Sequence, residues 1–312
     1  MRIMEEVRGM DLKDRFNFVD FLEERLEQEK KMIAKQKKMQ KEKYRLLDEI
    51  RQNLVEKLTG DGACGLVENE SHCHPKSNLF ASCDPVNTRH VDSFLYPDDD
   101  AVDELCATGK LSRNYCKNCL STDIEPINFI SHSMSEEQTR WIFNSLPDLT
   151  GKRVLDIGSR LGVVLYTGYL FSNASRLVGI ELNESFVKIQ NELVSKYKWN
   201  DRIQIICGDI MNHADTIAQS DVVVMNNVFD AFVPQEQLFK IWEFIFASFQ
   251  KMKKGSYIVT YPSLDESLEH AQVPNDTKRT WTSHITPLPL DLQHLTPHIA
   301  EEVEGMAIYL KN

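Results

Sequence analysis

The chain has 312 residues, 42% of them apolar, which is enough for one large domain and an accessory region. Its formal net charge of −11 disfavours indiscriminate nucleic-acid binding by the body of the protein, without excluding a local RNA-binding surface. No run of about 18 apolar residues is present and the N-terminus lacks the apolar core of a secretory signal. We therefore expect no membrane span and an intracellular location, cytoplasmic or nuclear.

The first predicted element is a long charged helix in residues 1–58, with a helical pattern from about Leu12 to Leu58. Its apolar residues recur at close to seven-residue spacing, which is typical of a coiled coil. They are Val19, Leu22, Leu26, Ile33, Leu47, Ile50 and Leu54. The repeat is broken in the middle, where lysines gather between Lys30 and Arg45. The pattern favours a solvated helix, either a weak coiled coil that self-associates or binds a protein partner or an arm packed on the main domain. The alternative is a basic surface for RNA or an acidic partner.

Residues 59–130 are predicted to form an irregular subdomain, because the helical period disappears there. Six of the seven cysteines lie in it, and Cys116 and Cys119 have the spacing that lets two thiolates reach one tetrahedral ion. The remaining ligands of a zinc site would be Cys106 and one of Cys83, His74 and His90. Because no second cysteine pair of this kind is present, the pattern favours free thiols and we assign no metal. An odd number of cysteines also predicts no disulfide framework.

Residues 131–312 alternate predicted helices and strands, as in an α/β fold with a parallel sheet. Ser135 and Gln138 form a capping-box pattern that predicts the start of the first helix. Two later helices, over 184–197 and 234–251, show one apolar stripe each. The predicted strands are RVLDI, LVGIEL, IQIICGD, DVVVMNN and SYIVTYP, with a last strand at MAIYL.

Polar side chains end four successive predicted strands. Asp156 lies in the first strand, Glu181 ends the second, Asp209 the third, and Asn226 with Asn227 the fourth. The carboxyl ends of parallel strands meet at one edge of a sheet, where α/β folds bind nucleotide-like ligands. We therefore expect these side chains to surround one ligand. The alternative for each carboxylate is a helix N-cap, which for Asp209 taken alone is the simpler interpretation.

The loop after the first strand carries Gly158 and Gly162. Without a Cβ, such residues let a ligand approach the backbone, and N–H groups at a helix start favour a carboxylate. This loop and the strand ends resemble the class I S-adenosylmethionine-dependent methyltransferases. The resemblance implies a doubly wound, mostly parallel seven-stranded sheet with an antiparallel last strand, and S-adenosyl-L-methionine as cofactor. The family usually has a third glycine where this chain has Arg160, whose side chain either leans outward or holds the cofactor carboxylate.

The resemblance also implies roles for the strand-end residues. In this family the first carboxylate pairs with the ammonium of the methionine moiety, the second binds both ribose hydroxyls, and the third contacts the adenine amine. The asparagine pair looks similar to that of the non-SET histone lysine methyltransferases, although one asparagine is otherwise a loop-forming residue. The predicted catalytic residues are Asn226 and Asn227, and the predicted cofactor-binding residues are Asp156, Gly158, Arg160, Gly162, Glu181 and Asp209.

Amide oxygens at the fourth strand end would accept hydrogen bonds from an N–H group. The expected reaction is therefore methyl transfer to a nitrogen of a protein side chain or a small molecule, with oxygen and carbon acceptors left open. One alternative is an RNA methyltransferase that uses the basic helix. Another is an inactive scaffold with a methyltransferase fold, which the departure at Arg160 keeps open. His132, Asp230 and Tyr261 are further residues expected near the site.

Overall fold

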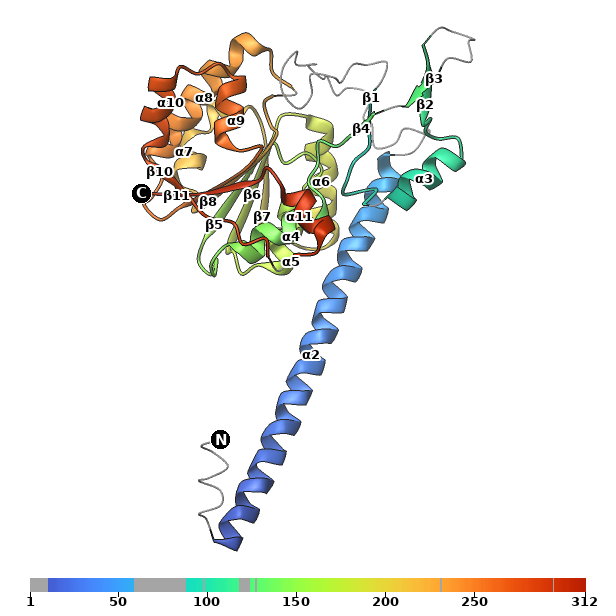
Figure 1. The fold of residues 1–312 in the computed structure, drawn as a ribbon, viewed down its shortest axis with the longest axis vertical. Coiled ribbons are helices and arrows are strands. Elements are labelled where there is room, and N and C mark those ends of the chain that lie inside the picture. Colours follow the sequence, from blue (N-terminus) through green and yellow to red (C-terminus); the bar gives the residue numbers. More distant parts are fainter. Residues whose placement is uncertain are drawn as a thin grey trace. The chain divides into compact units, whose positions relative to one another are not determined.

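A computed structural model describes residues 11–58, 88–97, 99–117, 124–126, 128–230, 232–293 and 295–312 (Figure 1). The chain divides into two compact units, residues 1–49 and residues 50–312. None of the helices in the described ranges combines the length and the apolar composition that a bilayer span requires.

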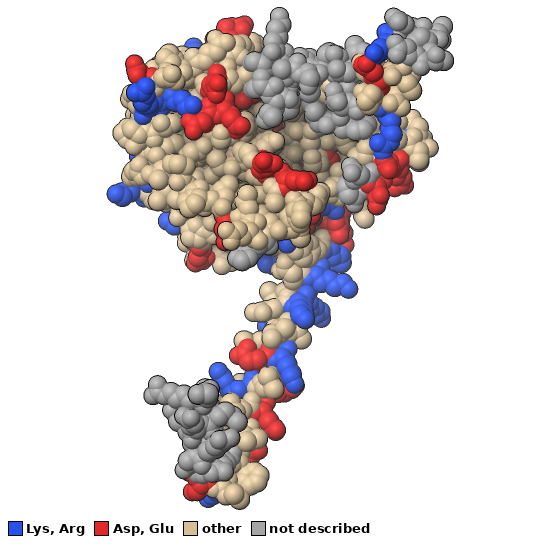
Figure 2. Space-filling model, in the orientation of Figure 1, with Lys and Arg blue, Asp and Glu red and all other residues tan. Residues whose placement is uncertain are grey.

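The long helix α2 spans Leu12–Leu58, as the apolar spacing predicts. Within residues 11–49 several of its apolar side chains face solvent: Leu12 is 71%, Leu26 is 56% and Ile33 is 48% exposed. Figure 2 shows Lys and Arg side chains distributed along the same helix. Exposed apolar residues at heptad spacing are typical of a surface that another helix covers. Self-association or partner binding through α2, and the alternative RNA surface, stay predictions.

Short elements make up the described part of the segment before the large sheet. Strand β1 (Thr88–His90) pairs in parallel with β4 (Asn128–Ile130). Strand β2 (Asn114–Cys116) pairs antiparallel with β3 (Ile124–Pro126), and helix α3 spans Asp99–Ala107. Whether residues 59–130 fold as a separate subdomain stays a prediction.

The predicted zinc ligands fall mostly beyond the described ranges. Cys106 is a half-buried free thiol, and the residues that the structure describes contain no group of three His, Cys, Asp or Glu placed to hold a metal. Outside the described residues lie Cys64, Cys73, Cys83, Cys119, His72 and His74, and the side chain of His90. The choice between zinc and free thiols therefore stays a prediction.

One sheet of seven strands forms the centre of the larger unit, in the order β10–β11–β9–β8–β5–β6–β7. Its strands are β5 (Arg153–Ile157), β6 (Arg176–Glu181), β7 (Ile203–Cys207), β8 (Val222–Asn226), β9 (Tyr257–Tyr261), β10 (Ile285–Pro287) and β11 (Ala307–Lys311). Strands β5 to β9 run parallel, and β11 runs antiparallel to both β9 and β10. The expected mostly parallel sheet with an antiparallel last strand is confirmed.

Helices cover both faces of this sheet, which makes the fold doubly wound (Figure 1). On one face lie α4 (Glu136–Ser145), α5 (Val163–Phe171) and α6 (Glu184–Lys196). On the other lie α7 (Ala214–Ala218), α8 (Gln235–Gln250) and α9 (Leu264–His270). The shorter elements are η2 (Ile210–Asn212), α10 (Asn275–Thr282) and α11 (Pro297–Val303).

The first helix of this domain, α4, starts as its capping box predicts. Ser135 Oγ accepts the Gln138 N–H at 3.1 Å, and Gln138 Oε1 accepts the Ser135 N–H at 2.9 Å. These two bonds satisfy backbone donors that a helix start otherwise leaves unpaired. The cap thereby sets where the chain turns from the segment before the sheet into the domain.

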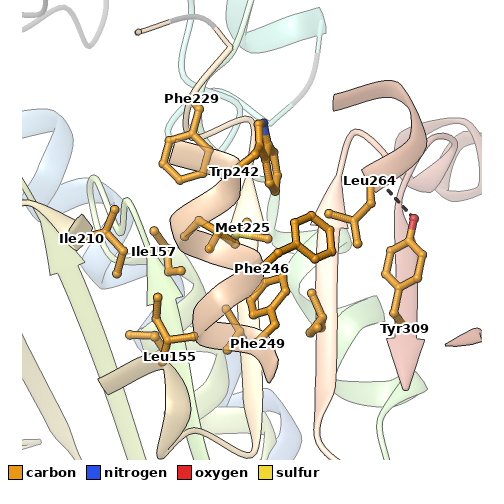
Figure 3. Close-up of a cluster of buried hydrophobic side chains, with 14 of the residues drawn as sticks. Leu155, Ile157, Ile210, Met225, Phe229, Trp242, Phe246, Phe249, Leu264 and Tyr309 are labelled. Carbon is orange, nitrogen blue, oxygen red and sulfur yellow. Dashed lines mark hydrogen bonds between the residues drawn. The ribbon is translucent and has the colours of Figure 1, made fainter. Parts of the chain in front are cut away.

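A large apolar core fills the space between the sheet and helices α7 to α9 (Figure 3). Leu155 and Met225 on adjacent strands and Phe246 on α8 are 0%, 2% and 1% exposed. Burying one such side chain stabilises a protein by about 1.5–3 kcal/mol, so this layer holds β5 and β8 in place. At its border the Tyr309 hydroxyl accepts the Leu264 N–H at 2.9 Å, which ties β11 to α9.

Candidate functional site

The register of the parallel strands brings the predicted polar ends to one edge of the sheet. Ile157 pairs with Ile180 on one side and with Met225 on the other. The residues that follow each of these positions therefore emerge side by side at the carboxyl edge. Glu181 ends β6 there and Asn226 ends β8 there, with the loop that leaves β5 between them.

Asp156 and Glu181 place two carboxyl groups at this edge, and only 4% and 8% of these residues is exposed. Burial raises the pKa of Asp156 to about 8, and the neighbouring charge of Glu181 adds to this rise. Burial also raises the pKa of Glu181, against the lowering effect of backbone hydrogen bonds. A positively charged ligand beside these two carboxylates would offset the cost of burying their charges and would reduce the repulsion between them. The site therefore favours a cationic ligand.

Both oxygens of the Glu181 carboxylate accept backbone N–H groups, and the backbone of Leu182 also interacts with this carboxylate. Oε2 accepts from Arg160 at 2.7 Å and Oε1 accepts from Asn183 at 2.8 Å. A carboxylate has about four lone-pair sites, so these bonds leave it able to accept further donors. Two hydroxyls on neighbouring carbons match this remaining capacity.

Gly158 and Gly162 both lie in the left-handed region, with φ of 72° and 87°. A Cβ on Gly158 would stand 2.5 Å from Val228 Cγ2, and one on Gly162 would stand 2.7 Å from Tyr166 Cζ. Glycine is thus required at both positions for conformation and for space. The sequence suggested that these glycines leave room for a ligand, and the structure adds that they leave room for two of the chain's own side chains.

Arg160, which replaces the third glycine, is buried at 7% exposed and also has a positive φ of 42°. Its guanidinium pairs with the carboxylate of Asp92 and donates to Ser133 Oγ at 3.0 Å. It also lies 5.2 Å from the ring centroid of Phe186. The expectation of an outward-leaning side chain is therefore wrong, because a buried carboxylate holds it inside. The sequence offered no indication of Asp92, which lies 68 residues earlier.

Asp209 differs from the other strand-end residues. Strand β7 ends at Cys207, so Asp209 follows the strand and is exposed. Its Oδ1 accepts the Met211 N–H at 2.9 Å and caps the short helix η2. The simpler N-cap interpretation describes this carboxylate, and contact with adenine stays a prediction.

The two asparagines lie at the end of β8 in different surroundings. Asn226 Nδ2 donates to the His132 carbonyl at 3.3 Å. Asn227 has φ 46°, is 6% exposed, and its N–H donates to the Tyr261 carbonyl at 2.5 Å. The Oδ1 of Asn227 is buried and accepts no hydrogen bond from the described residues. The backbone of Asn227 thus starts a loop, while its side-chain Oδ1 accepts no hydrogen bond from the described residues.

A cavity of about 10 Å³ lies beside Asn227, between the ends of β8 and β9 and helix α8. Among the described residues, four buried polar atoms of its lining have no hydrogen-bond partner: Asn227 Oδ1, Asp230 Oδ1, Trp242 Nε1 and Thr260 Oγ1. The volume suits about one water molecule, which would donate to the oxygens of Asn227 and Asp230 and accept from the indole N–H. Sequence reasoning named Asp230 but not Trp242, which has the apolar spacing of a core residue.

We expect Asp230→Asn to stabilise the folded protein near neutral pH. Burial raises the pKa of Asp230 to about 7, so the folded chain keeps a proton that the unfolded chain has already released. The contribution of this carboxyl group to the free energy of unfolding therefore falls as pH rises to about 7, and it is constant above that pH. Denaturant unfolding between about pH 5 and pH 9 should show the variant's advantage growing up to about pH 7. An advantage that shrinks with pH would contradict this, and exposed Asp276→Asn is the control.

Residues 155–245 match a family model described as a methyltransferase domain. This segment runs from β5 to α8 and includes the glycine loop and all four polar strand ends. The mostly parallel sheet of seven strands, with its antiparallel β11, is the one that the resemblance to class I implies. Residues 155–245 thus match a methyltransferase domain, within a sheet of the class I type.

Solved structures resemble this methyltransferase domain only distantly. A putative caffeoyl-CoA O-methyltransferase from Staphylococcus aureus is 14% identical, covers 52% of this chain and 76% of its own, and has a TM-score of 0.34. Geranyl diphosphate methyltransferase in complex with S-adenosylmethionine is 13% identical over 57% and 86%, with a TM-score of 0.39. A Thermotoga maritima O-methyltransferase is 16% identical over 58% and 67%, with the same TM-score of 0.39. No curated protein sequence matches the chain.

The cofactor of this methyltransferase is S-adenosyl-L-methionine, and the residues at its sheet edge suit that molecule. The cofactor carries a sulfonium, an ammonium and a ribose diol. Asp156 and Glu181 are carboxyls whose pKa values are raised by burial, so a positively charged ligand would offset the cost of their charge, and Glu181 has lone pairs left for further donors. The chemistry of this donor set fits the cofactor.

Proposed function

We propose that this methyltransferase transfers the methyl group of S-adenosyl-L-methionine to a nitrogen atom of a protein side chain or small molecule. The observation that carries the proposal is the pair of asparagines at the end of β8. One of them, Asn227, presents a buried Oδ1 that accepts no hydrogen bond from the described residues. An amide oxygen has two lone pairs, so beside a cavity water it can also accept the N–H group of a methyl acceptor.

In this proposal the carboxylates of the edge hold the cofactor. Asp156 pairs with the ammonium group, and Glu181 accepts hydrogen bonds from both ribose hydroxyls. Gly158 and Gly162 keep the loop close to the ligand, and Asp209 contacts the adenine amine. The support for these roles is the convergence of Asp156 and Glu181, whose charges interact.

The chain's own contribution to the reaction is alignment. Bound S-adenosyl-L-methionine supplies a methyl group that its sulfonium has already activated. Asn226 and Asn227 accept hydrogen bonds from the N–H groups of the acceptor and so turn its lone pair towards the methyl group. The acceptor nitrogen must be neutral, which an imidazole satisfies near pH 7 and a lysine amine, with its pKa of about 10.4, does not without help.

We expect the double variant Asn226→Ala, Asn227→Ala to lose methyl transfer while it still binds S-adenosyl-L-methionine. In this proposal the two side chains contact the acceptor, whereas Asp156 and Glu181 hold the cofactor. Radiolabelled methyl transfer into fractionated cell extract measures turnover and reports whether the product is protein, RNA or a small molecule. Exposed Asn173→Ala is the matched control. Retained turnover in the double variant would remove the asparagines from the reaction, and a label on oxygen or carbon would refute the nitrogen acceptor.

A further inference from the structure

A buried carboxylate outside residues 131–312 lies at the centre of a polar network. Asp92 is 0% exposed and follows strand β1. Its Oδ1 accepts the N–H groups of Phe94 and Leu95, both at 3.0 Å. Its Oδ2 accepts the Ser133 hydroxyl at 2.6 Å and pairs with the Arg160 guanidinium. Four hydrogen-bond donors therefore converge on the buried carboxylate of Asp92, two from the backbone of the turn that follows it and two from distant side chains.

One branch of this network reaches the loop between β5 and α5. The backbone of Arg160 donates to Glu181 Oε2 at 2.7 Å and accepts from Gln190 Nε2 at 2.8 Å. Its φ of 42° is a conformation that residues other than glycine rarely adopt, and it persists only where surrounding contacts enforce it. The ion pair with Asp92 is such a contact, and it acts on the residue whose backbone faces Glu181.

The other branch reaches the end of β8. Ser133, which donates to Asp92, also accepts from Arg160 Nη1 at 3.0 Å. The residue before it, His132, offers the backbone carbonyl that accepts the Asn226 side chain at 3.3 Å. Asp92 is thus connected to the glycine loop directly and to Asn226 through two adjacent residues.

We propose that Asp92 is a positioning residue for methyl transfer, which holds the cofactor loop through Arg160 and the asparagine end of β8 through Ser133. The inference rests on the proposed function, in which Glu181 and Asn226 contact cofactor and acceptor. A glycine at position 160 would leave the loop conformationally free. The buried ion pair between Arg160 and Asp92 instead holds the loop in one conformation.

Binding of S-adenosyl-L-methionine to the full chain, measured by calorimetry, tests this without any acceptor. Asp92→Asn and Arg160→Met each leave one buried charge unpaired and release the loop. We expect the Kd of each variant to rise about tenfold, with a lower midpoint of unfolding. An unchanged Kd in both would overturn the positioning role, while normal binding by the wild type would leave the methyltransferase assignment intact.

The double variant Asp92→Asn, Arg160→Met separates positioning from stability. It has no unpaired buried charge, so the midpoint of unfolding should recover towards that of the wild type. The loop still lacks the ion pair between residues 92 and 160, so the Kd should stay about tenfold above the wild-type value. Affinity that returns together with stability would show a merely structural pair and overturn the proposal.

Arg202→Met is the matched control. The guanidinium of Arg202 donates to the backbone carbonyls of Tyr169, Ser172 and Ala174 beside the amino end of β7, at the opposite edge of the sheet. Its loss should lower the midpoint of unfolding and leave the Kd unchanged. A Kd that rises in this variant as much as in Arg160→Met would mean that any loss of stability weakens binding, and would also overturn the proposal.

Discussion

Asp156→Asn is expected to stabilise the cofactor-free methyltransferase and, at the same time, to weaken its binding of S-adenosyl-L-methionine. Burial and the charge of Glu181 raise the pKa of Asp156 to about 8. Between the ordinary range of an aspartate and about pH 8, the folded chain holds a proton that the unfolded chain has lost. The carboxyl group therefore costs stability increasingly as pH rises through this window. Asparagine has nearly the same shape and stays neutral, so it removes this cost.

The free energy of unfolding of Asp156→Asn should exceed that of the wild type by on the order of a few kcal/mol near pH 7 to 8. The difference should be absent below about pH 4. Denaturant unfolding of wild type and variant across this range measures it. The affinity should change in the opposite sense, because a neutral amide offers the ammonium no ionic partner and the Kd should rise at least tenfold. Such opposition between stability and function is common where a site holds buried charge for a ligand. A variant that is less stable at pH 8 would refute the argument.

Glu181→Ala should weaken S-adenosyl-L-methionine binding by more than tenfold. In the proposed site its two oxygens accept the ribose hydroxyls, and alanine would lose two charge-assisted hydrogen bonds. Calorimetric titration well below the unfolding temperature gives the Kd, because the variant also leaves the N–H groups of Arg160 and Asn183 without this acceptor. Glu181→Gln keeps one acceptor oxygen and should bind with intermediate affinity.

Glu184→Ala is the control for this experiment. Glu184 is an exposed carboxylate in the first turn of α6, three residues along the chain, and it lies outside the proposed site. Its removal should leave the Kd close to the wild-type value. Unaltered affinity in Glu181→Ala itself would remove Glu181 from the cofactor site.

Local patterns predicted most of the elements that build this domain. The capping box at Ser135, the apolar strand at Arg153–Ile157 and the last strand all appear where the residues indicate. Such features depend on neighbouring residues, because caps, apolar stripes and strand alternation repeat within a few positions. The third strand is shorter than its apolar run predicts, because the run IQIICGD continues past the last paired residue, Cys207. Asp209 looks like a strand end in sequence but acts as a helix cap.

The amino-acid sequence determined the fold class and the polar ends of three of the parallel strands, and its resemblance to a known family implied the cofactor. Only the tertiary structure decided where Arg160 goes, and it places the side chain on Asp92. It likewise brings Trp242 to Asp230 around one small cavity. The physical reason is that residue type and periodicity report which groups are buried, whereas the partner of a buried charge or donor depends on how distant segments pack.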